Sequence, residues 1–134
     1  DESLPDTDVI LLGGALRKGH RYLYGPLALR ALEVLHANKA FLCPTSLVPG
    51  RGLMTNFEQM AELKRAFIEA SGTSIALLDA SKVGAGGLMR VAELQDIDLV
   101  VMDYDPEGTV AVQIRTLAKA GQHAPRLITS PHEK

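Results

Sequence analysis

Cysteine is almost absent from this chain of 134 residues, because Cys43 is the only one. A single cysteine excludes a disulfide within the chain and a zinc site built from cysteines, and it suits a reducing compartment. Metal-ligand spacings of the H-x-x-x-H and C-x-x-C kinds are missing too, so we expect no metal site. Cys43 follows an apolar segment, where a small buried residue is a more ordinary role than a reactive thiol.

Long hydrophobic runs and basic tracts are also missing. No apolar segment reaches membrane-spanning length and no signal peptide precedes the first apolar segment, so we expect a cytoplasmic protein without membrane contact. The formal net charge of −2 argues against binding nucleic acid through bulk electrostatics. The glycines at 13–14 and 84–87 match neither the dinucleotide fingerprint nor the P-loop. We therefore expect no bound cofactor.

Short apolar segments alternate with amphipathic ones along the chain. Residues 1–8 are predicted to be a flexible lead-in, and residues 9–134 a single α/β domain. The predicted strands are 9–12, 40–43, 74–78, 98–102 and 127–129, with a weaker edge strand and helical turn in 88–94. The predicted helices are 26–36, 56–71 and 109–120, and 44–55 is predicted to be a loop. This alternation is typical of a mainly parallel sheet that is covered by helices.

The clearest clue to a site is a lysine within the apolar stripe of a predicted helix. In segment 56–71, apolar side chains recur at helical spacing at Phe57, Met60, Ala61, Phe67 and Ile68. At about 100° per residue, the middle of this stripe is Lys64. Removing an ammonium from water is costly unless it is paired or serves a polar ligand. Lys64 therefore extends past the apolar edge, pairs with a buried carboxylate, or contacts a ligand.

Further polar residues and glycines directly follow the predicted strands. In open parallel sheets, ligands bind outside the carboxyl ends of the strands. The residues at these positions are Gly13, Gly14, Asp79, Lys82 and Asp103. Each has an ordinary structural role in a turn or on the surface. Together with Lys64, they would form a mixed-charge pocket suited to a small polyhydroxylated or phosphorylated ligand.

The order of several short motifs resembles that of a known family. The motifs are VILLGG at 9–14, GPLA at 25–28, KAFL at 39–42, RGLMT at 51–55, AELKRA at 61–66, LLDASKVG at 77–84 and DIDLVVMD at 96–103. They are similar to the C-terminal effector-sensing domain of DeoR/GlpR-type bacterial transcriptional regulators. The similarity runs over about residues 9–105, which is most of the chain.

This resemblance implies a Rossmann-like fold similar to ribose-5-phosphate isomerase and CoA transferases. It implies a phosphorylated sugar or related metabolite as effector, and DNA binding by an N-terminal winged helix. Carried over by position, Gly13 and Gly14 would border the pocket. Lys64 and Lys82 would attract anionic or oxygen groups of the ligand. Asp79 and Asp103 would accept hydrogen bonds from sugar hydroxyls or orient the lysines.

The chain departs from the family pattern at its start. It has no winged-helix segment, and it lacks the strand, phosphate-binding turn and second strand that open the family's sensor domain. We therefore expect a domain truncated at its N-terminus, which contacts DNA only through a domain outside this chain. Incomplete sheets expose strand edges, so we also expect a homo-oligomer.

Three functions remain open at the level of sequence. The leading prediction is a non-enzymatic effector-sensing and oligomerisation domain of a repressor. The alternative is a sugar-phosphate isomerase with Asp79 or Asp103 as general base and a lysine that stabilises the oxyanion. A third reading is a remnant that only assembles.

Overall fold

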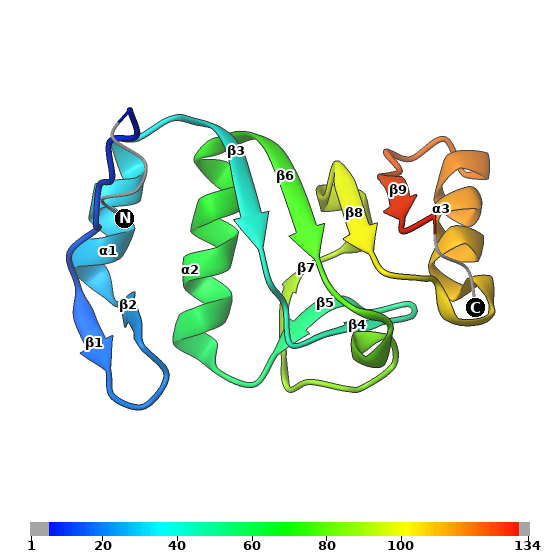
Figure 1. Cartoon of the computed structure of the whole chain (residues 1–134), viewed down its shortest axis with the longest axis horizontal. Coiled ribbons are helices and arrows are strands. Elements are labelled where there is room, and N and C mark those ends of the chain that lie inside the picture. Colours follow the sequence, from blue (N-terminus) through cyan, green and yellow to red (C-terminus); the bar gives the residue numbers. More distant parts are fainter. Residues whose placement is uncertain (1–5, 132–134) are drawn as a thin grey trace.

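A four-stranded parallel sheet forms the centre of the molecule (Figure 1). The computed structural model describes residues 6–131. The strands lie in the order β3 (Ala37–Leu42), β6 (Ser71–Leu77), β8 (Leu99–Met102) and β9 (Arg126–Thr129), and each neighbouring pair is parallel. Three of the five predicted strands extend by one to three residues beyond their predicted starts or ends, as short apolar runs commonly do. The predicted α/β fold with a mainly parallel sheet is confirmed.

A second, antiparallel sheet occupies the segment that the sequence predicted to be a loop. It consists of β4 (Ser46–Val48), β5 (Gly52–Thr55) and β7 (Met89–Ala92), in the order β4-β5-β7. The loop prediction for 44–55 was wrong because proline and glycine form only the hairpin tip, while Leu47 and Leu53 are buried. Gly52 has φ +102°, and a Cβ there would lie 2.3 Å from the carbonyl oxygen of Ala92. Glycine is therefore required for the close approach of β5 to the end of β7.

Three α-helices and three short 3-10 helices complete the fold. The α-helices are α1 (Pro26–Glu33), α2 (Glu58–Glu69) and α3 (Thr109–Lys119). The 3-10 helices are η1 (Ala80–Lys82), η2 (Leu94–Asp96) and η3 (Pro106–Gly108). Phe57 precedes α2 without a side-chain cap, and α3 is capped by Asp105, whose carboxylate accepts from the N–H groups of Val110 and Ala111 at 2.9 and 2.8 Å.

Residues 6–36 form a small lobe, here called the hairpin lobe, on the side of α2 away from the sheet (Figure 1). It contains α1 and an antiparallel hairpin of β1 (Ala15–Arg17) and β2 (Tyr22–Tyr24). The strand predicted at 9–12 is absent, and Val9, Ile10 and Leu11 are 74%, 81% and 85% exposed. An apolar segment becomes a strand only beside another strand edge, and this segment instead runs along α1. The predicted lead-in lies partly outside the described residues.

Two apolar clusters lie on either side of α2. The larger lies in residues 37–131, here called the sheet region, and its buried members are Leu42, Leu47, Leu53, Ala61, Ala76, Val91, Ala92, Leu94, Ile97, Val100, Met102 and Val110. The smaller joins α2 to the hairpin lobe through Ala28, Leu32 and Leu63. Helix α2 therefore packs against the sheet region through Ala61 and against α1 through Leu63.

Candidate functional site

The carboxyl ends of three parallel strands lie next to one another. Cys43 follows β3, Asp79 follows β6 after one residue, and Asp103 follows β8. The register pairs Leu77 with Val101, so Asp79 and Asp103 lie opposite each other at the sheet edge. Neighbouring strands are about 4.8 Å apart. The parallel topology therefore brings both of the aspartates selected from the sequence to one place.

Both aspartates hold the backbone of the loops at this edge. Asp103 Oδ1 accepts hydrogen bonds from the N–H groups of Ala80 and Tyr104, each at 2.8 Å. Asp79 Oδ1 accepts from the N–H of Ser81 at 2.9 Å and from the Ser81 hydroxyl. The hydrogen bond from the Ser81 side chain lowers the pKa of Asp79, and the positive charge of Lys82 acts in the same direction. The two carboxylates thus shape η1 and keep negative charge at the edge.

Lys64 reaches the same edge from α2. Its side chain is half-buried, and its Nζ donates a hydrogen bond of 2.6 Å to the carbonyl oxygen of Cys43. Burial lowers the pKa of Lys64, while Cys43 has a smaller effect in the opposite direction. No carboxylate within residues 6–131 forms an ion pair with this ammonium. The buried-carboxylate interpretation of Lys64 is therefore wrong for the part of the chain that the structure describes.

Gly13 and Gly14 lie away from this edge. They precede β1 in the hairpin lobe, on the far side of α2 from the ends of β6 and β8 (Figure 1). A Cβ on Gly14 would lie 2.7 Å from the carbonyl oxygen of Tyr24 and 3.2 Å from Cβ of Ala28, and its φ is +137°. Gly14 therefore allows the chain to pass close to β2 and α1. The structure does not bring these two glycines next to Asp79 and Asp103.

An aromatic and cationic cluster connects the hairpin lobe to α2, and the sequence did not reveal it. The guanidinium of Arg17 lies over the ring of Phe57, with Cζ 4.1 Å from the ring centroid. The ring of His20 packs against Phe57 at 5.3 Å and against Tyr22 at 6.2 Å between centroids. The two tyrosines at alternate positions, Tyr22 and Tyr24, directly before Gly25, were the available signal for a strand.

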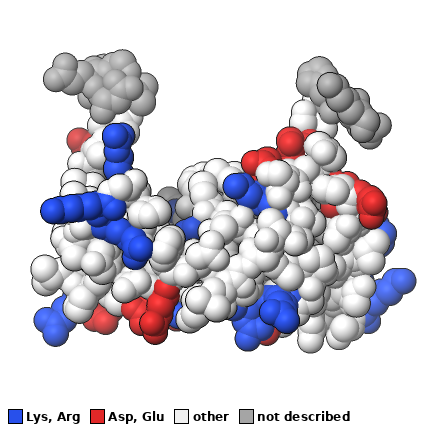
Figure 2. All heavy atoms as spheres, turned by 90° about the horizontal axis from the view of Figure 1, so that it is seen from below, with Lys and Arg blue, Asp and Glu red and all other residues white. Residues whose placement is uncertain are grey.

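Basic side chains are concentrated at this hairpin. Viewed toward the carboxyl edge of the sheet, several Lys and Arg side chains project together from the end of the molecule that carries the hairpin lobe, while side chains of both signs lie at the opposite end (Figure 2). Within the hairpin, the sequence supplies Arg17, Lys18 and Arg21. An anionic ligand would therefore meet positive potential on the hairpin side of the edge.

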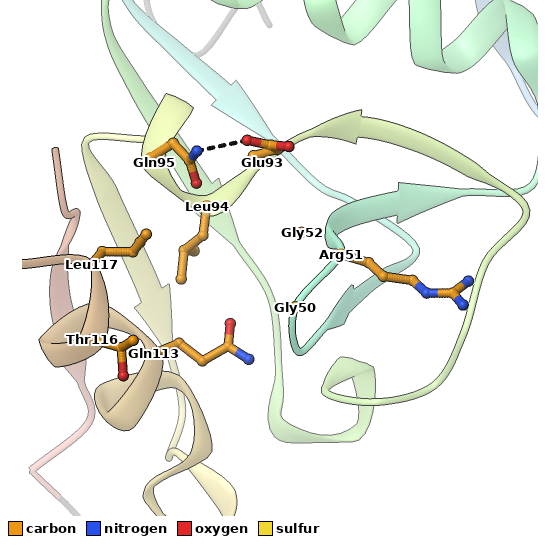
Figure 3. Close-up of a pocket in the computed structure, with 9 residues that line it drawn as sticks. All are labelled: Gly50, Arg51, Gly52, Glu93, Leu94, Gln95, Gln113, Thr116 and Leu117. Carbon is orange, nitrogen blue, oxygen red and sulfur yellow. Dashed lines mark hydrogen bonds between the residues drawn. The ribbon is translucent and has the colours of Figure 1, made fainter. Parts of the chain in front are cut away.

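A cavity of about 400 Å³ lies elsewhere, between the β4–β5 turn, η2 and α3. It is lined by Gly50, Arg51, Gly52, Glu93, Leu94, Gln95, Gln113, Thr116 and Leu117. Figure 3 shows Leu94 and Leu117 on its apolar side, while the Arg51 side chain extends away from them. Gln95 donates to Glu93 at 2.6 Å, and Glu93 also pairs with Arg90 at 3.2 Å. These polar groups satisfy one another, and the cavity contains none of the residues selected from the sequence.

The glycine-rich segment 84–87 has a packing role. Gly84 donates its N–H to the carbonyl of Leu47 at 2.8 Å. A Cβ on Gly87 would lie 2.6 Å from Cβ of Met54. This segment therefore packs closely against the β4–β5 hairpin. Across residues 6–131, no three His, Cys, Asp or Glu side chains gather as metal ligands, and no helix has the length and apolarity to cross a membrane.

Comparison with known proteins identifies the family. The model of the DeoR C terminal sensor domain matches residues 2–104. The repressor GlcR of Bacillus subtilis is 35% identical over 99 residues, which are 74% of this chain and 38% of that protein. A putative aga operon transcriptional repressor of Escherichia coli O157:H7 is 31% identical over 115 residues, 86% of this chain and 42% of that protein. An L-fucose operon activator of Haemophilus influenzae is 30% identical over 98 residues, 73% of this chain and 39% of that protein.

The chain spans about two fifths of the length of these relatives. The matched residues include the strands β3, β6 and β8, helix α2 and the hairpin lobe. The family model covers well over half of the chain. The chain therefore belongs to the DeoR family of transcriptional regulators, within which it corresponds to the C-terminal sensor domain.

Proposed function

We propose that this chain senses a phosphorylated sugar or a closely related metabolite for a transcriptional regulator. The ligand would occupy the carboxyl edge of the parallel sheet beside α2. Binding would favour one conformation of the domain and so change the population of the regulator that binds DNA. A winged-helix domain outside this chain would contact the operator, in the cytoplasm.

The observation that carries this proposal is the position of Lys64. A half-buried ammonium at the carboxyl edge, bonded to the carbonyl of Cys43 and to no carboxylate of the described residues, retains donors for a ligand. The burial that lowers its pKa also reduces the stability of the fold, and an apolar side chain could pack at this position without that cost. Perturbed ionisable groups of this kind are enriched at functional sites.

The remaining predicted residues have supporting roles in this proposal. Lys82 would add positive charge beside the edge, and its ammonium forms no hydrogen bond or ion pair among residues 6–131. Asp79 and Asp103 would accept hydrogen bonds from ligand hydroxyls with oxygens that the loop leaves available. Gly13 and Gly14 would act indirectly, because Gly14 lets the chain pass close to β2 and α1 inside the hairpin lobe.

Enzymatic turnover is not part of the proposal. A general base must be free to accept a proton from the substrate. The hydrogen bond from the Ser81 side chain lowers the pKa of Asp79 and makes it a weaker base, and Asp103 uses Oδ1 to hold two backbone N–H groups of its loop. Incubation with ribose 5-phosphate should therefore give no isomerisation above the uncatalysed rate, and turnover that Asp103→Asn abolishes would overturn this expectation.

Self-association is the second part of the proposed role. Strand β3 lies at an edge of its sheet, and Phe41 on it is 59% exposed. The apolar side chains of residues 9–11 are also exposed. Such edges and apolar surfaces favour contact with another chain. Light scattering over a dilution series should give a mass above that of one chain, and a single-chain mass at all concentrations would argue against assembly.

The decisive experiment is a thermal-shift panel of sugar phosphates on the wild-type chain, Lys64→Ala and Lys119→Ala. Lys119 is an exposed lysine in the last turn of α3 and serves as a matched control. A ligand should raise the melting temperature of the wild type and of Lys119→Ala but not of Lys64→Ala. A ligand that shifts all three proteins equally would remove Lys64 from the site, and the absence of any shift would contradict sensing by this chain.

A further inference from the structure

Arg17 is held in a fixed orientation by an aromatic ring. Its guanidinium lies over Phe57 with Cζ 4.1 Å from the ring centroid, and its side chain is half-buried. Contact with an aromatic face restricts the position of a guanidinium while its N–H donors stay able to bind a ligand. Arg17 is therefore organised before any ligand arrives.

The donors of this guanidinium have no acceptor in the described part of the chain. The ion pairs there are Arg90 with Glu93 and His123 with Asp98, and neither includes Arg17. Arg65, by contrast, donates to the carbonyl of Arg90 at 2.7 Å. A guanidinium has five N–H donors in a planar fork that fits a phosphate or a carboxylate with two parallel hydrogen bonds.

The residue opposite Arg17 in the hairpin is also unsatisfied. Tyr22 pairs with Arg17 across the two strands, so the two side chains lie on the same face of the hairpin. The Tyr22 hydroxyl is buried and has no hydrogen-bond partner among residues 6–131. A buried hydroxyl without a partner is uncommon in native proteins. Two neighbouring side chains on this face thus carry hydrogen-bonding groups that the chain itself leaves unused.

Lys64 lies on the same side of α2 as the ring that carries Arg17. Phe57 and Lys64 are seven residues apart, which is about two helical turns and about 10 Å along the axis. Between them on this face, Ala61 is buried and Met60 packs against the small cluster. The two cations are thus separated along α2 by about the length of a small sugar that bears a terminal anionic group.

We propose that Arg17 binds the anionic group of the effector, while Lys64 contacts the oxygen-bearing body of the same molecule. This inference rests on the proposed sensing function and adds the polarity of the ligand and a second anchoring residue. The ligand class is a polyhydroxylated molecule with one terminal phosphate or carboxylate. Because Arg17 belongs to the hairpin lobe and Lys64 to the sheet region, the bound ligand connects the two.

The other basic residues of the hairpin do not share this geometry. Lys18 and Arg21 are exposed, and neither lies over an aromatic ring in the described structure. They contribute to the positive potential but not to an oriented fork. Lys18→Gln is therefore a matched control for Arg17→Gln, because it removes one positive charge from the adjacent position of the same hairpin.

The test measures binding of three probes, which are inorganic phosphate, ribose 5-phosphate and ribose. Titrations are followed by NMR through the ring protons of His20 and Phe57, which pack against each other beside Arg17. In the wild type, phosphate and ribose 5-phosphate should shift these signals, and ribose should not.

Arg17→Gln should weaken the binding of both anions about tenfold or more, as expected for a lost charge-assisted hydrogen bond, while Lys18→Gln should change their affinities less than threefold. Gluconate in place of ribose 5-phosphate distinguishes a carboxylate from a phosphate.

Arg17→Lys tests whether anion binding needs the guanidinium itself or only a positive charge. It also serves as a second variant in case Arg17→Gln does not fold. It retains the positive charge but cannot form two parallel hydrogen bonds, so it should lose most of the affinity for anions. Equal binding by the wild type and Arg17→Gln would overturn the proposal, and so would an equal loss in Lys18→Gln. Weaker ribose 5-phosphate binding in Arg17→Gln together with unchanged binding in Lys64→Ala would support the anion anchor and contradict the proposed sensing role of Lys64. No effect of either anion on His20 or Phe57 would overturn the anchor.

Discussion

The sheet region and the hairpin lobe differ in how much apolar surface holds them together. Twelve buried residues form the cluster of the sheet region, whereas three form the cluster between α2 and the hairpin lobe. Large apolar side chains of the lobe remain exposed, including Leu16, Leu27 and Val34 at 63%, 68% and 85%. Since stability scales with buried apolar area, the lobe should open more easily than the sheet.

This difference gives the proposed site a physical rationale. Lys64, Asp79 and Asp103 are positioned by the well-packed sheet region, whereas Arg17 is carried by the weakly packed lobe. A ligand that contacts both parts adds to the few contacts that hold the lobe, so binding favours the closed arrangement by mass action. Elements that move on ligand binding are commonly drawn from the least stable part of a fold.

The sharpest test of this comparison truncates a leucine in each region. Leu42→Ala in the large cluster should lower the free energy of unfolding by about 2–5 kcal/mol, because the residue is 1% exposed and the surrounding core cannot collapse around the cavity. Leu32→Ala in the small cluster should cost about 1–2 kcal/mol, because its site lies near the surface and relaxes. Urea unfolding monitored by circular dichroism gives both values.

Hydrogen exchange shows which elements of the fold each of these two substitutions destabilises. Leu42→Ala should raise exchange throughout β3, β6 and β8, whereas Leu32→Ala should raise it in α1 and the β1–β2 hairpin and leave the sheet protected. Equal acceleration everywhere in both variants would mean that the lobe and the sheet unfold as one unit, and the comparison would then fail.

Two glycines provide a second comparison of the regions. Gly52→Ala would place a Cβ 2.3 Å from the carbonyl of Ala92 and 2.9 Å from Cα of Glu93, so it should cost about 2–3 kcal/mol in the sheet region. Gly14→Ala is nearly as crowded, but the atoms it meets, Tyr24 O and Ala28 Cβ, lie within the weakly packed lobe, where β2 and α1 can shift, so its cost should be about 1 kcal/mol. Gly50→Ala controls for backbone strain alone, because its φ is +77° and no atom lies near the added Cβ. Melting curves in which Gly14→Ala is as damaging as Gly52→Ala would show that the lobe is rigid.

Among the strands that the sequence predicted, those with a partner strand were right, and the one without a partner was wrong. Apolar runs led correctly to β3, β6 and β8, because each is buried by its neighbours. Residues 9–12 have the same composition but no strand beside them, and no single-sequence pattern reports whether a partner exists. The β4–β5 hairpin was missed for a different reason. Pro49, Gly50 and Gly52 suggested a loop although Leu47 and Leu53 on either side are buried.

The candidate site was accessible to sequence reasoning only in part. Lys64 was found because a charge interrupts a helical stripe, and Asp79 and Asp103 because parallel strands end at one edge. Arg17 was not found, because its significance comes from a contact with Phe57, forty residues later. Gly14 was placed at the wrong edge because the strand before it does not form. Contacts between distant segments are set by packing, and local patterns do not encode them.

The cap of α3 offers a smaller effect within the sheet region. Asp105→Ala should lower the free energy of unfolding by about 1 kcal/mol, because the carboxylate accepts from two N–H groups of the first turn. Thr109→Val removes a hydroxyl at the start of the same helix, which donates to the carbonyl of Pro106 at 2.8 Å. It should cost less than Asp105→Ala in the same urea titration, and the reverse order would show that Asp105 is not the main cap of α3.

Substitution of Lys64 should give the smallest change in stability. The sign of that change shows whether the lysine serves packing or ligand binding. Burial lowers the pKa of this lysine in the folded state from its ordinary 10.5, so the unfolded chain holds the proton more tightly. The charged side chain therefore reduces stability at neutral pH, and this cost is relieved as the pH rises from the folded pKa toward 10.5. Lys64→Met removes the charge and keeps the apolar stem, so at pH 7 it should unfold with equal or greater free energy, by about 1 kcal/mol or less.

Thermal unfolding at pH 7 and pH 10 checks this expectation, and the advantage of Lys64→Met should shrink at the higher pH. A clear loss of stability in Lys64→Met would assign the lysine a structural role through its bond to the Cys43 carbonyl. An equal or raised stability, with loss of the sugar-phosphate thermal shift, would mean that the fold retains a costly charge for the ligand. The sheet region would then contain a locally unfavourable group at the point where the weakly packed hairpin lobe supplies the second cation.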